Sequence, residues 1–249
     1  MKKFTNTVMA AAVAGLFLQA PVCAGIDFEG KAMQLAGEVL ANPAAFFYDF
    51  QQDLEATHPL PPGKWMGFQM GLFPSLLPMG YGNLSGKVRI HPEGRWKPGL
   101  PQLDFIGGYW DMVWAKLAAN QADDVNEASF HGYYAGAIMS SSVSPRARVF
   151  WGYKHSMLKA SLNLKKAQDI LGQQVSRFDS GFKDDFFIAG LEHPYGMNKW
   201  WSIQLNYGVA EKIMSSKVSW YGRHFELGLN IYPEGVLVIH PVWNWHWNF

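Results

Sequence analysis

The C-terminal stretch Gly235-Val-Leu-Val-Ile-His-Pro-Val-Trp-Asn-Trp-His-Trp-Asn-Phe249 alternates between apolar and polar residues. Taken in steps of two, one series reads Phe249, Trp247, Trp245, Trp243, Pro241, Ile239 and Leu237, and the other reads Asn248, His246, Asn244, Val242, His240 and Val238. Because side chains on a β-strand point alternately to opposite faces, the stretch predicts a strand with one apolar, tryptophan-rich face and one mostly polar face. Three tryptophans followed by a phenylalanine on one face are typical of a strand whose apolar face meets lipid.

This ending resembles the C-terminal signal strand of bacterial outer-membrane β-barrel proteins, which alternates in the same way and finishes in an aromatic residue. The resemblance covers this strand and the general layout of the chain, and it identifies no specific family. It implies an antiparallel transmembrane β-barrel in the cell outer membrane, with outer-membrane lipids and the barrel-assembly machinery as partners. The aromatic residues expected at the membrane interface are Trp201, Tyr207, Trp243, Trp245, Trp247 and Phe249.

The start of the chain has the layout of an export signal. It begins Met1-Lys-Lys, continues with an apolar run over residues 8–20, and reaches Pro-Val-Cys-Ala24. We predict residues 1–24 to be a signal peptide, which implies an exported protein. A lipoprotein acylated at Cys23 is the less favoured alternative, because the preceding Pro and Val suit that modification poorly. Cleavage would remove the only cysteine, and a closed barrel can hold together without disulfides because no strand edge stays unpaired.

The composition agrees with a membrane barrel. Charged residues make up 16% of the chain, against about 25% in ordinary soluble domains. Aromatic residues make up 15%, and 11 of them are Trp. No apolar run after the signal is long and pure enough for a membrane-spanning helix, so any span must be made of strands. The net charge of +1 gives no indication of nucleic-acid binding.

Residues 25–63 predict a helical N-terminal segment followed by a linker. Asp27 is a candidate N-cap for a first helix, and Asn42-Pro43 begins a second one. We interpret them as two helices that pack on the core; the alternative is an amphipathic segment in the membrane interface. The prolines of residues 57–63, Thr-His-Pro-Leu-Pro-Pro-Gly, indicate a linker.

Residues 64–249 are expected to form the barrel domain. The stretch from Trp65 to Tyr81 is apolar but interrupted by glycines and prolines, and it fits an inner plug, a docking loop or an extra strand. The remainder predicts about eight strands and thus an all-β fold, a narrow barrel filled by side chains. The predicted strands are 84–91, 103–119, 127–143, 146–162, 183–193, 198–210, 217–232 and 235–249.

Several of these strands alternate as lipid-facing strands do. In 198–210 the apolar odd-numbered residues oppose Ser202, Gln204 and Asn206. In 103–119 the same reasoning points Ile106 and Trp110 outward.

The lengths of the connections conflict with this strand count. Short turns near Ser144-Pro145, at 194–197 and at 233–234 fall on one end, and longer links fall on the other. Outer-membrane barrels have short turns in the periplasm. A last strand that ends in the periplasm would therefore put the long links on the wrong side. Either a strand is miscounted or the barrel is unusual, and we suspect the count because strand boundaries are the least reliable feature read from a sequence.

If the apolar faces meet lipid, polar residues gather in the lumen. The expected lumen network is Asp111, Arg148, Lys154, Gln204, Asn206, Asn230, His240, Asn244 and Asn248. Within it His224, Glu226 and His246 are candidate acid/base groups, and Ser202 is a candidate nucleophile. Imidazoles with a carboxylate could equally bind zinc, although no tight ligand motif such as His-Glu-x-x-His is present. Neither a metal nor another cofactor is expected. The remaining histidines, including His58 in the predicted linker, are individually uninformative.

A structural role for these polar groups is the favoured interpretation, because a narrow barrel must fill its interior with polar side chains that satisfy one another. The His-x-Ser pair that outer-membrane phospholipases and the lipid A deacylase carry along one strand does not occur here. A helix before a barrel resembles the lipid A palmitoyltransferase in architecture only, and no catalytic residue follows from that.

Three functions remain open. The first is a non-enzymatic outer-membrane barrel with a narrow polar lumen, serving envelope integrity, small-solute passage or presentation of surface loops. The second is an outer-membrane enzyme that modifies lipid A or phospholipid. The third is a soluble periplasmic lipocalin-like binding protein, whose apolar strand faces would point inward and whose Asn/His faces would point outward.

Overall fold

The computed structural model of the chain describes residues 55–72, 81–113, 116–117, 120, 125–145, 147–170, 173–197, 199–210, 212, 214–231 and 242–249. The predicted signal peptide and the two predicted N-terminal helices lie outside the described residues. No helix in the described part of the chain is long and apolar enough to cross a membrane.

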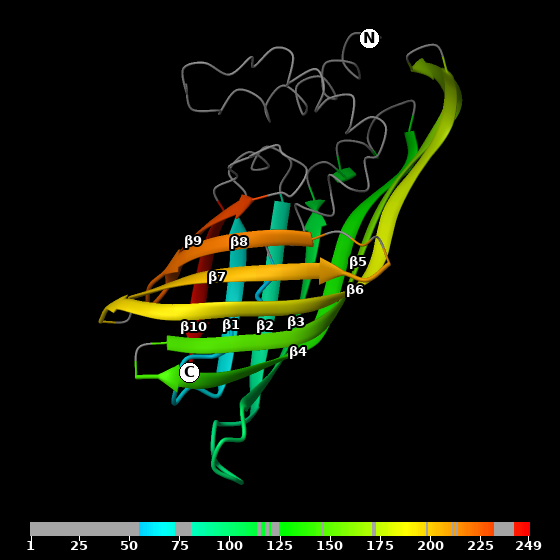
Figure 1. The fold of residues 1–249 in the computed structure, drawn as a ribbon. Helices are drawn as coiled ribbons and strands as arrows, with labels where there is room; N and C mark the ends of the chain where they lie inside the picture. The colour runs from blue at the N-terminus through cyan, green and yellow to red at the C-terminus, as the bar shows by residue number, and fades with distance from the viewer. Residues whose placement is uncertain are drawn as a thin grey trace, which may run out of the picture.

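The described strands form one closed antiparallel barrel (Figure 1). They are β1 Met66–Leu72, β2 Tyr81–His91, β3 Gln102–Met112, β4 Val125–Ser144, β5 Ala147–Ile170, β6 Gln173–Gly196, β7 Lys199–Gly208, β8 Met214–Tyr221, β9 Phe225–Ile231 and β10 Val242–Asn248. Each strand pairs with its sequence neighbours, and β1 pairs with β10 to close the barrel. The predicted C-terminal strand is therefore confirmed over its last residues, and an all-β fold is confirmed.

The closing seam joins the two ends of the barrel domain. In the register between β1 and β10, Gly67 lies opposite Asn248 and Leu72 lies opposite Trp243. The seam continues one residue further, where Trp65 N donates to the carbonyl oxygen of Phe249 at 2.7 Å. Closure leaves no open edge that could pair with another chain.

The predicted count of about eight strands is wrong; the barrel has ten. One added strand is β1, which lies in the stretch that the sequence left unplaced. The other comes from the predicted strand 217–232, which is a hairpin of β8 and β9 with a turn at residues 222–224. The turn Gly-Arg-His carries neither Pro nor an Asn-Gly pair, the strongest hairpin signals, and so the sequence does not mark it as a turn.

The extra hairpin removes the conflict over loop lengths. The short turns at 145–146, 197–198 and 222–224 lie at the end of the barrel where β10 also finishes; we call this the short-turn end. The links 73–80 and 232–241 join strands at the opposite end, the long-link end. Apart from the two-residue connection 171–172 between β5 and β6 at the long-link end, this is the asymmetry expected of outer-membrane barrels.

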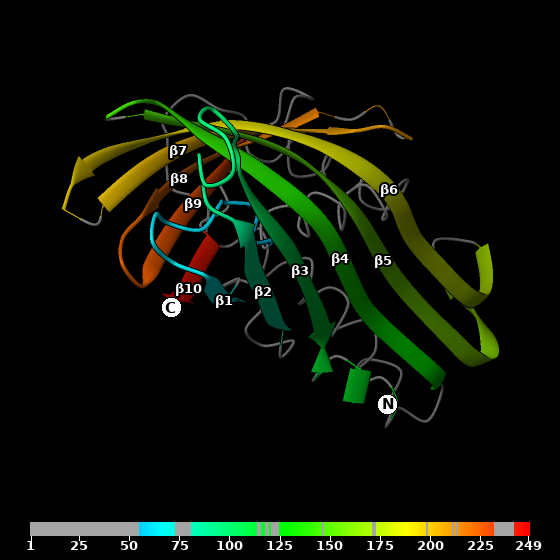
Figure 2. The ribbon, with the colours of Figure 1, turned by 90° about the horizontal axis from the view of Figure 1, so that it is seen from below.

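Strand lengths are very uneven around the barrel. The strands β5 and β6 have 24 residues each, whereas β1, β9 and β10 have 7 each. As a result the β5–β6 hairpin projects well beyond the other strands at the long-link end (Figures 1 and 2). One connection at the short-turn end is long, namely the loop 92–101 between β2 and β3.

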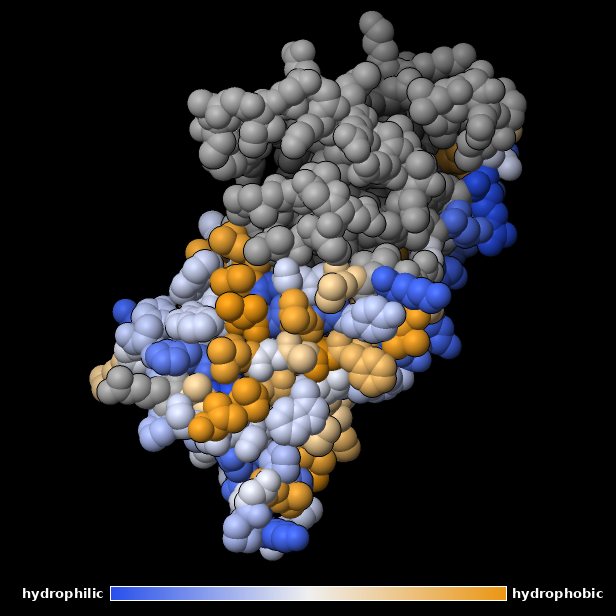
Figure 3. Space-filling model, in the orientation of Figure 1, coloured by the Kyte–Doolittle hydropathy of each residue, from blue (hydrophilic) through white to orange (hydrophobic). Residues whose placement is uncertain are grey.

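The outer face of the barrel is apolar. On β7 buried and exposed residues alternate, with Ser202, Gln204 and Asn206 inside and Ile203 and Leu205 outside, as predicted. Figure 3 shows apolar side chains gathered over the strands, with hydrophilic residues on the projecting hairpin. Exposed apolar side chains on the strands include Met70, Leu84, Val88, Phe105, Tyr109, Phe187, Ile203, Leu205, Phe225, Trp243 and Trp247.

The predicted faces of β3 are reversed. Ile106 and Trp110 are buried inside the barrel, and Phe105 and Tyr109 are exposed outside it. Both faces of this strand carry large apolar residues, so hydrophobicity alone could not decide between them. The soluble lipocalin-like alternative required apolar faces inward and polar faces outward, which is the reverse of the arrangement on β7 and β10.

Candidate functional site

Residues 55–60 lie inside the barrel, and we call them the plug segment. Ala56, Thr57 and Leu60 are completely buried, and Glu55 and His58 are nearly so. Its last four residues, 57–60, belong to the stretch that the sequence predicted to be a linker. A linker would run over the surface, whereas these residues fill the lumen.

Side chains of the barrel wall form hydrogen bonds with the backbone of the plug segment. Because the segment pairs with no strand, each buried N–H and C=O needs another partner. Ala56 N donates to Tyr134 Oη at 2.7 Å, and Leu60 N donates to Asp104 Oδ2 at 2.7 Å. Lys87 Nζ donates to the carbonyl of His58 at 2.5 Å. Proline has no N–H, so Pro59 leaves one donor fewer to satisfy.

The carbonyl oxygen of Leu60 is the most heavily bonded atom of the plug segment. It accepts hydrogen bonds of 2.9 Å from Arg89 Nη2, Gln102 Nε2 and Arg148 Nη1, which come from three different strands. Bonds from charged donors are roughly twice as strong as neutral ones. The three donors therefore fix where the chain leaves the lumen.

Plug side chains also bond to the wall. The carboxylate of Glu55 forms an ion pair with Lys154 and accepts a 2.5 Å hydrogen bond from Ser156 Oγ. Thr57 Oγ1 donates to Gln204 Oε1 at 2.6 Å. All these groups are buried, so removal of one partner would leave a desolvated polar group.

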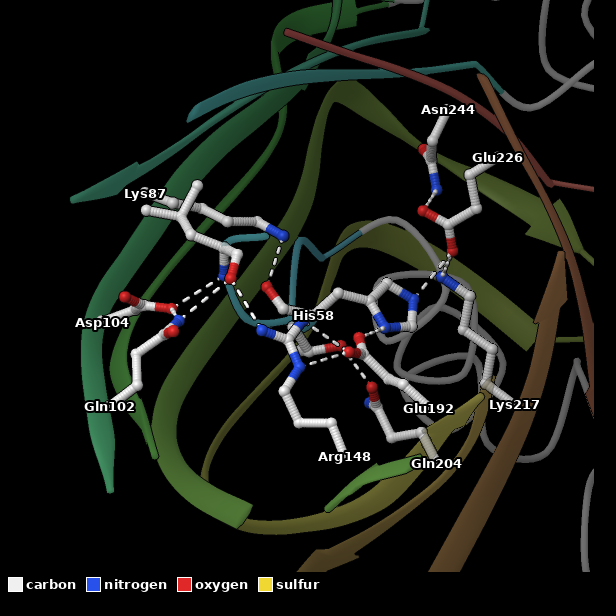
Figure 4. A network of polar contacts seen from close by, with 12 residues as sticks. His58, Lys87, Gln102, Asp104, Arg148, Glu192, Gln204, Lys217, Glu226 and Asn244 are labelled. Carbon is white, nitrogen blue, oxygen red and sulfur yellow. Dashed lines mark hydrogen bonds and ion pairs between the residues drawn. The ribbon is translucent and has the colours of Figure 1, made fainter. Parts of the chain in front are cut away.

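His58 stands between two carboxylates (Figure 4). Its Nε2 lies 3.0 Å from Glu226 Oε1, and its Nδ1 lies 3.5 Å from Glu192 Oε1. The imidazole ring also packs against Tyr221, at a centroid distance of 5.0 Å, and against Phe150, at 6.0 Å. A single side chain of the plug segment thus connects strands β5, β6, β8 and β9.

Three further ion pairs line the lumen wall. Arg89 Nε lies 3.3 Å from Asp104, Arg148 Nη2 lies 2.5 Å from Glu192, and Lys217 Nζ lies 2.9 Å from Glu226. Next to these pairs, the plug residue Ala56 packs into a small apolar cluster. Its other members are Ile106, Tyr134, Ile138, Phe150 and Ile188. The interior is therefore a mixed core, in which these charged groups are paired rather than left bare.

Most of the predicted lumen residues lie inside, and a few do not. Arg148, Lys154, Ser202, Gln204, Asn206, Glu226, Asn244 and His246 are buried in the interior. Asp111 accepts a hydrogen bond from Tyr109 Oη and lies on the face opposite Trp110, away from this network. The side chain of Asn230 and all of His240 lie outside the described part of the chain. Of the predicted interface aromatics, Tyr207, Trp243, Trp247 and Phe249 are exposed, and Trp201 and Trp245 are half-buried.

Sequence reasoning missed the residues at the centre of the network. On β2 the buried residues Asn83, Ser85, Lys87, Arg89 and His91 alternate with the exposed Leu84, Val88 and Ile90. That alternation is visible in the sequence and would have predicted the polar face of β2. No comparable signal exists for His58, because a proline-rich stretch reads as a linker whether or not a barrel surrounds it.

A cavity of about 530 Å³ lies beside the plug segment at the short-turn end. It brings together the predicted acid/base candidates His224, Glu226 and His246, and adds His58. His246 Nε2 lies 2.7 Å from the carbonyl of Gly222 in the turn. Ser202 does not line the cavity, and none of its described lining residues is Ser, Thr or Cys. Histidine–carboxylate proton transfer is available there, but the described lining offers no serine, threonine or cysteine nucleophile.

Within the described residues no group of three or more His, Cys, Asp or Glu is arranged to hold a metal ion. The chain matches no protein-family model, and a search of curated proteins finds no similar sequence.

Proposed function

We propose that the chain is an outer-membrane β-barrel protein whose lumen is closed by its own plug segment and whose long β5–β6 hairpin is presented at the cell surface. The observation that carries the membrane assignment is the distribution of polarity: ion pairs inside, and exposed apolar side chains around the outside. In water such a distribution would leave a large apolar surface exposed. In a bilayer it is the expected arrangement of a spanning barrel.

The filled lumen argues against passive passage of solutes. Ten strands enclose a narrow interior, and the plug segment and the ion pairs around it occupy that interior. Among the three roles that the sequence left open for a membrane barrel, presentation of surface structure then fits best. Two 24-residue strands that project beyond the rim provide that structure.

Two partners follow from this assignment. Outer-membrane lipids would contact the apolar band, and the barrel-assembly machinery would recognise the C-terminal strand. The short-turn end would face the periplasm and the long-link end the cell exterior, as short periplasmic turns and longer external loops require.

Membrane fractionation combined with gel migration tests the location. The folded barrel should be found in the outer-membrane fraction and should change its migration on a gel after heating. Recovery in the soluble periplasmic fraction, without a heat-dependent shift, would contradict the proposal.

Cysteine labelling in intact cells tests the orientation. We would place single cysteines at two exposed positions, Lys166→Cys on the projecting hairpin and Lys97→Cys in the loop of the short-turn end, in a chain with Cys23→Ser. A membrane-impermeant maleimide should label the first variant in intact cells and the second only after lysis. Equal labelling of both, or the reverse pattern, would refute the orientation.

Planar bilayers test whether the lumen is closed. The wild-type barrel should show no steady ion conductance, and a variant that lacks residues 55–60 but still folds should conduct. Stable open-channel levels in the wild type would contradict a closed lumen.

A lipid-modifying enzyme is the second candidate, favoured by one observation: His58, His246 and Glu226 line the same cavity. Lipid A and phospholipids would be profiled in a deletion strain and in strains carrying His224→Ala or Glu226→Ala. Identical lipids in all of them would exclude this candidate.

A further inference from the structure

One buried cation of the described lumen has no carboxylate within ion-pair distance. Five Lys or Arg side chains are buried in the described interior: Lys87, Arg89, Arg148, Lys154 and Lys217. Four of them lie within ion-pair distance of a described carboxylate. Lys87 has no described carboxylate at that distance, and its ammonium donates to the carbonyl of His58. An ammonium has three protons to donate, so it has room for further acceptors.

Lys87 lines the cavity at the short-turn end together with Gln69, whose side chain carries an unsatisfied donor. The Nε2 of Gln69 has no hydrogen-bond partner among the described residues, although only 2% of the residue is exposed. Gln69 sits on β1, with His246 opposite on β10 and Ser85 opposite on β2. A buried amide donor without a partner is costly, and it indicates a place where an acceptor binds.

The charges around the cavity favour an anion. Lys64, Lys87 and Arg223 contribute three positive charges to its lining, and Glu226 is the only described carboxylate side chain there. The charge of Glu226 is already compensated by Lys217 at 2.9 Å, and the same carboxylate lies 3.0 Å from His58 Nε2. The remaining lining is therefore positive.

The size of the cavity suits a small molecule. The cavity of about 530 Å³ lies within the range of roughly 300–1,000 Å³ usual for small-molecule sites. Trp200 and Tyr221 supply aromatic surface to its wall.

We propose that this cavity binds a small organic anion, whose carboxylate or phosphate group accepts hydrogen bonds from Lys87 Nζ and Gln69 Nε2 and whose apolar part packs against Trp200 and Tyr221. The anion is either a soluble metabolite or the headgroup of a lipid, because the two share this chemistry. The site requires only the closed barrel and its plug segment, so it goes beyond the proposed function and does not depend on which membrane holds the protein.

Calorimetric titration of the folded barrel in neutral detergent tests the site. The probes are phenyl phosphate and benzoate as soluble anions, benzamide as a neutral analogue of benzoate, and dihexanoyl phosphatidic acid as a lipid. At least one anion should bind, and benzamide should bind more weakly than benzoate. Higher affinity for the phosphatidic acid would identify a lipid headgroup as the ligand. Higher affinity for phenyl phosphate or benzoate would identify a soluble anion.

Variants at the two donors separate this site from non-specific attraction. Lys87→Met should weaken anion binding roughly tenfold or more, as expected for a lost charged hydrogen bond, and Gln69→Met should weaken it to a smaller extent. Lys97→Gln removes an exposed charge outside the cavity and should leave binding unchanged. Heat-dependent migration checks that each variant folds; if Lys87→Met does not fold, Gln69→Met alone decides. Binding of no anion at millimolar concentration, or equal affinity in the wild type and the folded donor variants, would overturn the proposal.

Discussion

The Nε2 atom of His58 lies 3.0 Å from Oε1 of Glu226, although 168 residues separate the two in the chain. One belongs to the plug segment and the other to β9, so the contact crosses the lumen. The Nδ1 atom of the same ring lies 3.5 Å from Glu192 on β6. Because these groups are buried, the plug segment cannot leave the lumen without separating polar partners in a place that excludes water.

The ion pair between Glu55 and Lys154 provides a first prediction. Lys154→Met removes the cation and leaves the buried carboxylate of Glu55 with only its hydrogen bonds. Breaking a buried pair on one side costs about 3–5 kcal/mol, and we expect a loss of that order in the free energy of unfolding, measured by reversible urea titration. The double variant Glu55→Gln/Lys154→Met leaves no charge unpaired and should recover most of the loss. Equal destabilisation in both variants would argue against the pair.

Gly67 tests the packing of the plug against β1. A Cβ at this position would lie 2.8 Å from Leu60 Cδ2 and 2.6 Å from Asn248 Oδ1. Overpacking of this kind costs roughly 1–3 kcal/mol, so Gly67→Ala should lower the urea midpoint. Gly86 on the neighbouring β2 is the matched control, because a Cβ there would meet nothing within 4 Å. If Gly67→Ala were as stable as Gly86→Ala, Leu60 would not pack where we describe it.

The outer face is tested by a charge near the middle of β7. Ile203 is 43% exposed, so Ile203→Arg would be nearly neutral if the side chain faced water. In a bilayer, arginine on the lipid face costs about 2–4 kcal/mol at the midplane and about 0–1 kcal/mol near the interface. We therefore expect Ile203→Arg to impair folding into vesicles much more than Val143→Arg, at the strand end of β4. The comparison uses urea titrations in lipid vesicles, and equal effects of the two substitutions would count against a spanning barrel.

Glu93, in the loop at the short-turn end, gives a pH-dependent prediction. Partial burial raises the pKa of its carboxyl, but hydrogen bonds from Ser141 Oγ, Ser142 N and Ser142 Oγ, at 2.8–2.9 Å, outweigh burial and hold the pKa below the ordinary value of 4.5. A carboxyl group whose pKa is depressed in the folded state stabilises the fold at pH values above its ordinary pKa. That stability is lost as the pH falls through the folded-state pKa.

Glu93→Gln should therefore be less stable than the wild type at neutral pH, by less than about 1 kcal/mol because the site is exposed. The difference should vanish on acidification. Unfolding free energies of both proteins at neutral and acidic pH provide the measurement. A difference that stays constant with pH would mean that the charge of Glu93 does not hold the loop to β4.

The sequence predicted the parts of the fold that follow from alternation along a single strand. The faces of β7 and of the C-terminal strand were correct, because polar and apolar residues separate cleanly there. The faces of β3 were wrong, since Ile106 and Trp110 are apolar yet fill the interior. The strand count failed at residues 222–224, where a turn lacks the usual turn residues.

The centre of the site depends on contacts between distant parts of the chain. His224, Glu226 and His246 could be grouped because they belong to adjacent strands. His58 could not, since its position depends on the plug segment entering the barrel, where its partners Glu192 and Glu226 lie more than a hundred positions later in the chain. The donors that hold the plug, such as Arg89 and Arg148, lie on strands far apart in sequence.

The most direct test of the plugged lumen is an NMR measurement on the folded barrel with selectively labelled histidine, tyrosine and phenylalanine rings. The His58 ring lies 5.0 Å from Tyr221 and 6.0 Å from Phe150, centroid to centroid. We expect nuclear Overhauser contacts from the His58 ring to the Tyr221 ring, absent from the spectrum of His58→Gln, which identifies the signals. A folded barrel in which the His58 ring shows no contact with Tyr221 would contradict the placement of residues 55–60 inside the lumen.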